Sequence, residues 1–250
     1  MTIALLGLLA FLVITKRTIR TSPKKTLMYL TTGAITAAHW AFFFEAIKVS
    51  NVSITLTTLA STSLFVALIE PIFFRRKIIG YEVLFGLVTL AGLAIIFQAE
   101  SEYSMGVLLA LASAVLAAIF GTLNGVFVKN DRPTVITTYE MLGGVIGLSI
   151  YYLIVDQPFI IPNGIDWIWI LILGLVCTSM AFVVSIEVMK TLSPFTVSIS
   201  INMEPIYAIF FALIIFQDDE FMSPLFYLGG LIVMSTIFLN SYIKRKRTNA

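Results

Sequence analysis

Long apolar segments, separated by short polar joints, constrain the fold of this chain more than any other feature. They lie at residues 2–15, 27–47, 52–74, 79–97, 104–128, 134–155, 167–189, 194–216 and 222–243. All but the first have the roughly 20 residues that a membrane-spanning helix needs. With 59% hydrophobic and 12% charged residues, the composition excludes an ordinary soluble domain. The sequence therefore predicts an all-α, polytopic helical membrane protein of about nine helices.

The basic residues predict how these helices are oriented. If the joint at residues 16–25 is cytoplasmic, the alternation of spans places all of the 16 Lys and Arg residues except Lys48 on that side. Cytoplasmic joints of membrane proteins carry such an excess of Lys and Arg. We therefore expect an outside N-terminus and a cytoplasmic C-terminus in the plasma membrane, which in a bacterium is the inner membrane.

The two halves of the sequence align weakly with each other. Residues 53–57 fall on residues 196–200, and the basic joint 75–77 falls on the acidic joint 218–220. Joints of opposite charge at equivalent places are what two halves inserted in opposite directions require. This pattern predicts an inverted repeat, which is common among secondary transporters.

Two inverted five-helix repeats follow from this alignment. The first, incomplete repeat is predicted at residues 1–98 and the second at 104–243, with a basic cytoplasmic tail at 244–250. The segment at 2–15 is only half as long as a full span and lies next to an outside terminus. We therefore expect that one helix upstream of it is missing relative to a ten-helix parent.

Four stretches of the sequence carry a family resemblance, namely AIKVSNVS at 46–53, VMKTLSPFTVSISINMEP at 188–205, QDDE at 217–220 and FYLGGLIVM at 226–234. Through them the chain resembles the EamA-like family of the drug/metabolite transporter superfamily. The resemblance implies two inverted five-helix repeats, in each of which the fourth helix has a central proline and ends in an acidic residue. Pro205 and Glu220 match this pattern, whereas in the first half Thr62 replaces the proline and Arg76 and Lys77 replace the acid.

Glu204 is the first candidate for a substrate-binding residue, and also one for proton coupling. It lies near the middle of the apolar run 193–220, where a carboxylate costs about 2.5–3.5 kcal/mol on insertion scales and usually faces a protein interior or a water-filled cavity. Pro205 should bend the helix beside it. Ser198 and Asn202 share a helix face and can hydrogen-bond a polar solute. Hydrogen bonds that merely join helices are the alternative for these side chains.

Hydroxyl side chains in the segment 52–74 are candidates for the opposite wall of the same site. Thr55, Thr58 and Thr62 share a face at helical spacing, and Ser61 aligns with Glu204 in the repeat register. A helix that is polar on one side inside a membrane faces either protein partners or water. We therefore predict that Thr58, Ser61 and Thr62 contact the substrate.

Trp40 and His39 are further candidates within an aromatic stretch. Trp40 could line a cavity for apolar or aromatic solutes. His39 is the only histidine, and its ring can change charge near neutral pH, so it is a second candidate for proton coupling. Core packing is the alternative for both residues.

The remaining acidic residues in the helices have structural interpretations. Glu70 is expected to pair with Arg75 or Arg76 at the membrane edge, and Glu140 with Lys129. The two ion pairs expected at i and i+3 are Glu45–Lys48 and Glu187–Lys190.

Small residues predict where helix backbones approach each other. Gly121 with Gly125, and Gly143 with Gly147, each form a GxxxG motif, which permits close packing of membrane helices. Asn124 lies within the first of these faces and could form a hydrogen bond across it.

Motifs for catalysis are absent from the sequence. It contains no GxGxxG, P-loop or HExxH pattern, and one His and one Cys cannot form a metal site. We therefore expect no cofactor, no metal and no enzymatic activity.

The sequence is best interpreted as a secondary transporter that moves a small organic metabolite or drug-like solute by alternating access, coupled to protons or to another gradient. The expected partners are this solute and membrane lipid, with no nucleic acid, and a homodimer is left open. Two alternatives are a membrane-embedded enzyme and an inactive, truncated transporter fragment that acts as an interaction subunit.

Overall fold

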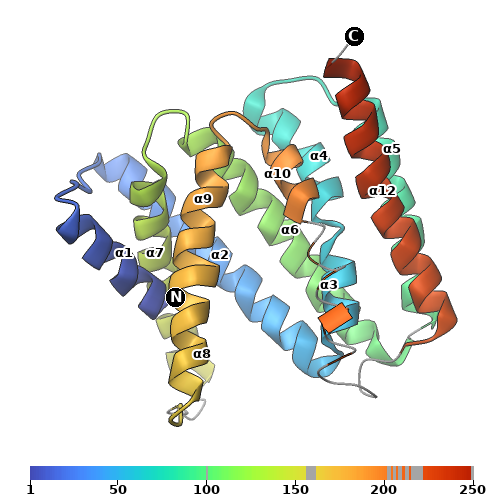
Figure 1. The fold of residues 1–250 in the computed structure, drawn as a ribbon, viewed down its shortest axis with the longest axis horizontal. Coiled ribbons are helices and arrows are strands. Elements are labelled where there is room, and N and C mark those ends of the chain that lie inside the picture. The colour runs from blue at the N-terminus through green and yellow to red at the C-terminus, as the bar shows by residue number, and fades with distance from the viewer. Residues whose placement is uncertain are drawn as a thin grey trace. The chain divides into compact units, whose positions relative to one another are not determined.

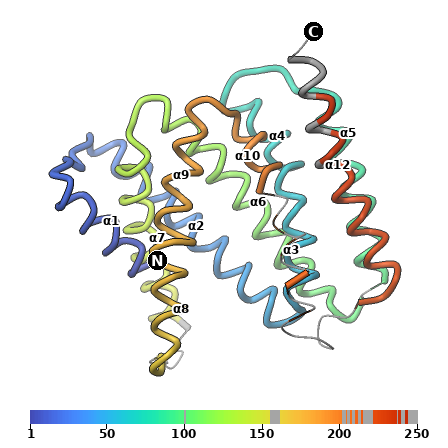
Figure 2. The backbone as a smooth tube through the Cα atoms, viewed as in Figure 1, coloured from blue at the N-terminus to red at the C-terminus, as the bar shows by residue number. Residues whose placement is uncertain are grey.

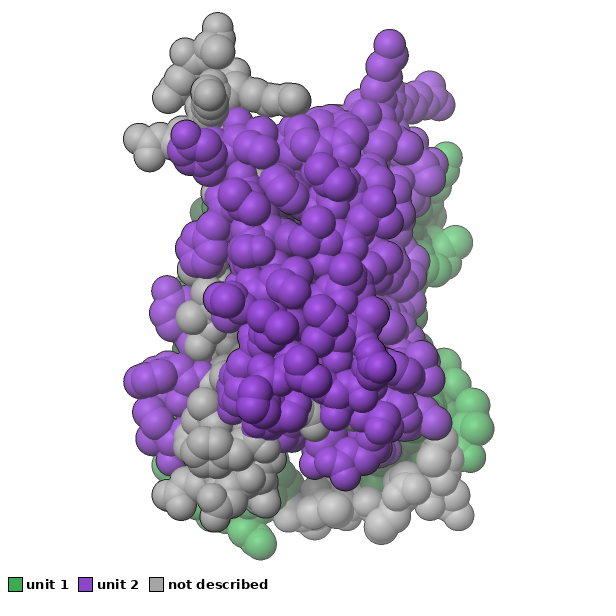
Figure 3. All heavy atoms as spheres, turned by 90° about the vertical axis from the view of Figure 1, so that its right-hand side faces the viewer, with its two compact units in different colours: residues 1–38, 123–193 green, residues 39–122, 194–250 purple. Residues whose placement is uncertain are grey.

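The computed structural model describes residues 1–99, 101–155, 162–201, 204, 207, 210–211, 214 and 222–248 (Figure 1 and Figure 2). Helices dominate this part of the chain, and no strand occurs in it. The predicted all-α class is therefore confirmed. Two compact units can be distinguished (Figure 3). Unit 1 comprises Met1–Ala38 and Leu123–Ser193, and unit 2 comprises His39–Thr122 and Pro194–Ala250.

Five of the eight predicted full-length membrane spans are confirmed as long apolar helices. Within the described ranges, five are long and apolar enough to cross a membrane, namely Pro23–Val49, Val52–Phe74, Gly80–Ala99, Ser101–Phe127 and Asp166–Val188. Their limits lie within about one helical turn of those predicted from hydropathy. Pro23 and Pro133 each open a helix, where the missing N–H of proline costs no hydrogen bond.

Unit 1 contains the short N-terminal helix and the helices that follow the middle of the chain. Its elements are α1 (Thr2–Ile14), the first part of α2 (Pro23–Val49), α7 (Pro133–Val155), α8 (Asp166–Ile172), η2 (Leu173–Met180) and α9 (Ala181–Val188). Helix α1 packs against α7 and η2, and its Ala4 and Leu8 form a buried core with Met141. The segment η2 is a π-helix in which the Thr178 hydroxyl donates to the Leu173 carbonyl at 2.7 Å.

Unit 2 is built around two helices that lie side by side, α5 and α12 (Figure 1). Its elements are α3 (Val52–Leu59), α4 (Thr62–Phe74), α5 (Gly80–Ala99), η1 (Ser101–Tyr103), most of α6 (Ser104–Phe127), α10 (Pro194–Ile201) and α12 (Pro224–Thr248). A Cβ on Gly92 would lie 2.8 Å from the Gly229 carbonyl oxygen, so the two backbones are in contact. Helix α4 packs against both α5 and α10.

The two predicted GxxxG faces behave differently. A Cβ on Gly143 would overlap with the backbone of Leu30, so α7 lies directly against α2 and the prediction for this motif is confirmed. At Gly121 no atom of the described residues lies within 4 Å of such a Cβ, so no close approach is seen at this residue, and the Gly121–Gly125 motif stays a prediction. The motif makes a flat helix face possible, but tertiary packing decides whether another backbone approaches it.

Each compact unit contains helices from both halves of the sequence. Unit 2 takes α3, α4 and α5 from the first half and α10 and α12 from the second. The compact units are therefore not the sequence halves, and the repeats at 1–98 and 104–243 stay a prediction.

Candidate functional site

The span predicted at residues 52–74 changes its hydrogen bonding in the middle, where Ala60 and Ser61 keep right-handed helical dihedral angles. Helix α3 ends at Leu59 and α4 begins at Thr62. Between them, the Ser61 N–H donates to the Thr58 carbonyl oxygen at 3.0 Å, a bond that reaches back three residues as in a 3-10 turn. Inside a membrane, irregular backbone is tolerated only where it is buried in protein or lines a water-filled cavity.

Hydroxyl side chains satisfy backbone carbonyls at this turn. The Thr62 hydroxyl donates to the Leu59 carbonyl at 2.7 Å, and the Ser63 hydroxyl donates to the Ala60 carbonyl at 3.1 Å. The sequence analysis missed the break because neither proline nor glycine marks it. The sequence signal for this break was the run of Ser and Thr from 53 to 63, whose hydroxyls can bond to the backbone. The separate bend predicted at Pro205 lies outside the described residues.

Several buried hydroxyl groups of unit 2 have no hydrogen-bond partner within the described part of the chain. They include those of Thr57, Thr58, Ser61, Thr122 and Ser198. Elsewhere, as at Thr36, the hydroxyl donates to the carbonyl of the preceding turn. Buried polar atoms without partners are uncommon in folded proteins, and each hydroxyl can both donate and accept. These groups can therefore bind water or the polar atoms of a solute.

Ser198 is carried by the helix that lies against α4. Phe195 and Ile199 of α10 share a buried core with Val66 and Ala67 of α4. This packing holds α10 in place through apolar contacts on both sides of Ser198. Of the predicted site residues, Thr58, Ser61 and Ser198 thus lie in the interior of the same compact unit.

The other predicted site residues have different environments. Thr62 is half-buried, and its hydroxyl is already bonded to the α3 carbonyl. Glu204 is exposed, and Asn202 lies outside the described residues. Trp40 is half-buried, with its ring edge-to-face to Phe44 at a centroid distance of 6.5 Å.

His39 is packed tightly in unit 2. Its Nδ1 lies 2.9 Å from the Ser113 carbonyl oxygen and 2.7 Å from the Ser113 hydroxyl oxygen, and that hydroxyl donates to the His39 carbonyl at 3.0 Å. The ring stacks on Phe43 and meets Phe120 edge-on. Because the Ser113 carbonyl can only accept, this geometry favours a proton on Nδ1.

A buried charge network joins α4, α5 and α10. Arg76 Nε lies 3.2 Å from Glu70 Oε1, and Arg76 Nη2 lies 3.3 Å from Glu82 Oε2. The Phe195 N–H, at the start of α10, donates to Glu70 Oε2 at 2.8 Å. Arg75, at a φ of 50°, adopts the left-handed conformation that ends α4. The predicted Glu70–Arg76 pair is confirmed, whereas Glu82 and the α10 contact were missed.

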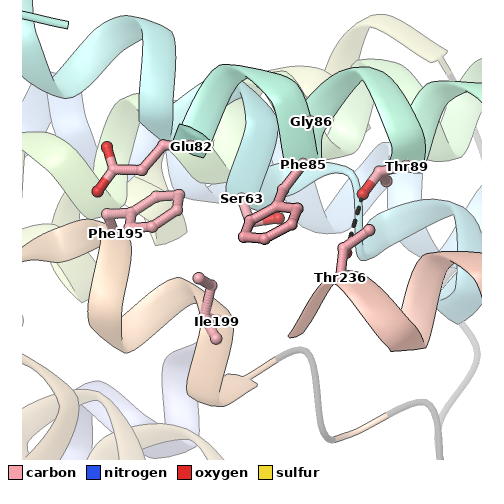
Figure 4. Close-up of a pocket in the computed structure, with 8 residues that line it drawn as sticks. All are labelled: Ser63, Glu82, Phe85, Gly86, Thr89, Phe195, Ile199 and Thr236. Carbon is pink, nitrogen blue, oxygen red and sulfur yellow. Dashed lines mark hydrogen bonds between the residues drawn. The ribbon is translucent and has the colours of Figure 1, made fainter. Parts of the chain in front are cut away.

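A small cavity adjoins this network (Figure 4). Its lining comprises Ser63, Glu82, Phe85, Gly86, Thr89, Phe195, Ile199 and Thr236. The Thr89 and Thr236 hydroxyls are hydrogen-bonded to each other at 3.2 Å. The cavity volume of about 10 Å³ gives room for roughly one water molecule, so it cannot hold an organic solute.

Unit 1 has two cavities that are lined by basic side chains. Arg132 and Lys190 line both of them, Arg17 lines one, and Arg20 and Lys129 line the other. Basic pockets beside membrane helices suit anionic lipid headgroups. Their position in the joints agrees with a role at the membrane surface rather than in solute binding.

The partner predicted for Glu140 needs a correction. Glu140 does not pair with Lys129; its Oε2 instead accepts a hydrogen bond from Asn124 Nδ2 at 3.3 Å. Charge alone suggested the lysine, but the long side chain of Lys129 lies at the exposed end of the helix while Glu140 is buried. The predicted bond from Asn124 is confirmed, as are the pairs Glu45–Lys48 and Glu187–Lys190.

Apolar spans, a turn within one of them and buried polar groups define an integral membrane protein with a polar interior. The sequence pattern of the EamA-like transporter family matches residues 1–98 and 104–242. The chain therefore belongs to the EamA-like transporter family, as its sequence motifs predicted.

One curated relative and one solved structure are similar to the chain. The chain is 25% identical over 205 residues to "Uncharacterized transporter YxxF" of Bacillus subtilis (strain 168), a match that covers 77% of this chain and 63% of that protein. The chain thus spans less than two thirds of this relative's length. A solved structure described as "Crystal structure of protein" has the same fold, with a TM-score of 0.72 at 16% identity, covering 98% of this chain and 85% of that one.

Proposed function

We propose that the protein is a secondary transporter that moves a small organic solute across the membrane by alternating access. The observation that carries this proposal is the turn between α3 and α4, beside which Thr58 and Ser61 hold buried hydroxyls that have no partner among the described residues. Substrate sites of secondary transporters are typically formed by discontinuous helices near the middle of the bilayer. Membership of the EamA-like transporter family supports the same function.

The proposed solute site lies within unit 2. Thr58 and Ser61 form one wall, and Ser198 contributes from α10. Three hydroxyls without charge suit a solute that carries hydroxyl, amide or amine groups. Asn202 and Glu204, further along the segment after α10, are proposed to extend this wall.

The proposal also gives roles in transport to Glu204, Trp40 and His39. Glu204 would bind a solute amine or exchange a proton, since a carboxylate in an apolar span is costly unless it serves such a role. Trp40 would contact an apolar part of the solute. His39 is the second proposed proton carrier, with Ser113 as the group that orients its ring. The protein would act in the inner membrane of a bacterium, with its C-terminus in the cytoplasm.

Removing the unpartnered hydroxyls is expected to separate transport from stability. In Ser61→Ala and Ser198→Ala, transport affinity should fall by about tenfold, because each change removes one hydrogen bond to the solute. The melting temperature should stay unchanged or rise, because neither hydroxyl has a hydrogen-bond partner to lose in the part of the chain that the structure describes. A thermal-shift screen of amino acids, nucleosides and sugars would supply the solute for uptake measurements in proteoliposomes.

The matched control is Thr31→Val. Thr31 is exposed, and its hydroxyl is bonded to the carbonyl of Met28 in its own helix at 2.8 Å. Transport by this variant should equal that of the unchanged protein. If Ser61→Ala and Ser198→Ala also transported normally, the solute site would have to be sought elsewhere.

The role of Glu204 has a test of its own. In Glu204→Gln, uptake should fall by about 10- to 100-fold, the cost of losing a hydrogen bond to a charged group. Glu45→Gln is the control, since Glu45 is exposed and paired with Lys48 at a helix end. Uptake would be followed at several pH values in both variants. Unchanged flux in Glu204→Gln would remove this residue from the proposed site.

A further inference from the structure

The two basic cavities of unit 1 adjoin each other among the joints between its helices. Their volumes are about 370 and 420 Å³, within the usual range of ligand-binding pockets. Arg132 and Lys190 line both cavities, so the two have a wall in common. Arg17 lines only the first cavity, and Arg20 and Lys129 line only the second. Each cavity therefore has an arginine of its own beside the shared Arg132.

The acidic side chains of the two linings already have basic partners. Asp131, in the second cavity, accepts hydrogen bonds from Lys25 Nζ at 2.9 and 2.7 Å. Glu187, in the first cavity, is paired with Lys190. No ion pair within the described ranges includes any of the three arginines. Their positive charge is therefore left to attract an anion into the cavities.

The end of α1 fixes the position of Arg17. Lys16 has a φ of 52°, the left-handed conformation that commonly ends a helix, and the Arg17 N–H donates to the Leu12 carbonyl oxygen at 3.0 Å. The Arg17 guanidinium lies over the Phe11 ring, with its Cζ 5.6 Å from the ring centroid. This cation–π contact orients the guanidinium, while its N–H groups stay available to an acceptor.

Two contacts between distant residues attach the joint after α1 to the region of α7. The Tyr139 hydroxyl of α7 donates to the Ile19 carbonyl oxygen at 3.2 Å, and Lys25 Nζ lies 2.7 Å from Asp131 Oδ2. Arg20 lies between these two points of attachment, which explains why it lines a cavity at the start of α7. The second cavity is therefore shaped by long-range contacts and is not merely a run of surface charges.

Exposed apolar side chains flank the basic residues in sequence. Val13 and Ile14, just before the joint that carries Arg17, are 76% and 79% exposed. Val188 and Leu192, on either side of Lys190, are 37% and 44% exposed. A free phosphate would leave this apolar surface uncovered, whereas acyl chains pack against it. Basic cavities with apolar surface beside them thus suit an amphiphilic anion, that is, an anionic lipid.

We propose that the two cavities together bind the headgroup of an anionic phospholipid with two phosphate groups, such as diphosphatidylglycerol. Arg17 binds one phosphate, Arg20 binds the other, and Arg132 lies between them and contacts both. A planar guanidinium matches the oxygen atoms of a phosphate with two parallel hydrogen bonds. Thr134, which is 8% exposed and lines the first cavity, adds a hydroxyl donor. A headgroup with one phosphate would leave the arginine of one cavity without an anion.

This lipid site is separate from the proposed solute site, since all of its residues belong to unit 1. The inference therefore stands without the proposed transport activity. The charge distribution predicts that these joints face the cytoplasm, and the cytoplasmic leaflet carries anionic lipid. A lipid bound there joins the end of α1, the start of α7 and the turn after α9, so it should stabilise unit 1.

The test is the thermal stability of the full chain, purified in detergent, with diphosphatidylglycerol, phosphatidylglycerol, phosphatidylcholine or inorganic phosphate added at equal phosphate concentration. Diphosphatidylglycerol should raise the melting temperature saturably by several degrees, because a ligand that binds only the folded state stabilises it. It should also stay bound in native mass spectrometry. Phosphatidylglycerol should bind about tenfold more weakly or worse, since it lacks the second charged hydrogen-bond acceptor. Phosphatidylcholine and inorganic phosphate should have no effect.

Arg132→Gln is the decisive variant, because Arg132 lines both cavities. The apparent Kd for diphosphatidylglycerol should rise by about tenfold or more, the cost of losing hydrogen bonds to a charged group. Arg132→Lys keeps the charge but not the planar fork, so it should recover part of the affinity. Arg132 is exposed, so neither change should prevent folding.

Lys24→Gln is the matched control. It removes one positive charge from the same joint, but Lys24 is exposed and does not line either cavity, so the full lipid response should remain. Three results would overturn the proposal. Equal stabilisation by the two anionic lipids would indicate a site for one phosphate, and stabilisation by inorganic phosphate would indicate a soluble anion. Equal losses in Arg132→Gln and Lys24→Gln would indicate attraction by net charge alone.

Discussion

Replacing Glu70 with alanine is expected to destabilise the protein by about 3 kcal/mol, the lower end of the range for breaking a buried ion pair. The lower end applies because the Glu70 side chain is 3% exposed but that of its partner Arg76 is 26% exposed. The loss also leaves the Phe195 N–H, at the start of α10, without its acceptor. Thermal or denaturant unfolding of the purified protein would measure the change.

Glu70→Gln and Glu45→Ala are the comparisons for this prediction. Glutamine keeps a hydrogen-bond acceptor for the Phe195 N–H but loses the charge. The stability of Glu70→Gln should therefore lie between that of the unchanged protein and that of Glu70→Ala. Glu45→Ala removes an exposed ion pair with Lys48, which contributes at most about 1 kcal/mol. Equal stability of Glu70→Ala and Glu45→Ala would contradict a structural role of Glu70 in joining α4 to α10.

Gly33→Ala is expected to destabilise the protein by about 3 kcal/mol, at the upper end of the usual range for overpacking. A Cβ at this position would overlap with the Glu140 backbone, and backbone atoms cannot move aside as a flexible side chain can. Helices α2 and α7 would have to separate, and their close contact would be lost. The melting temperature of the purified variant is the measurement.

Gly121→Ala is the matched control, because it makes the same chemical change within a helix. No atom of the described residues lies within 4 Å of a Cβ at Gly121, so alanine meets no obstacle from them. It should be neutral or stabilise by about 0.5–1 kcal/mol, since glycine is a poor helix former. If both variants lost stability equally, backbone contact would not be the reason for the effect at Gly33.

Local pairs show what could be predicted for the site from the sequence. The bonds Glu45–Lys48 and Glu187–Lys190 follow from helical spacing alone, and they were predicted correctly. Glu70 and Arg76 are only six residues apart, and a pair of Glu70 with Arg75 or Arg76 was also predicted. The bond from Glu70 to Phe195 joins residues 125 positions apart, and no local pattern indicates it.

The turn between α3 and α4 shows what could not be predicted of the candidate site from the sequence. Hydropathy shows Val52–Phe74 as one apolar segment, and nothing at residues 60–61 resembles a helix breaker. The sequence marked Thr58, Ser61 and Ser198 as polar, but whether their hydroxyls find partners among the described residues depends on which helices surround them. That is a property of packing, not of spacing.

The sequence by itself determined the helical membrane class, the positions of the spans and the family, because apolar length and motif order are local features. Tertiary structure alone decided that α3 and α4 are separate helices, that Asn124 rather than Lys129 meets Glu140, and that Gly143 rather than Gly121 touches another backbone. The physical reason is that a side chain's partner is set by long-range packing, in which chemically equivalent positions on a helix meet different neighbours.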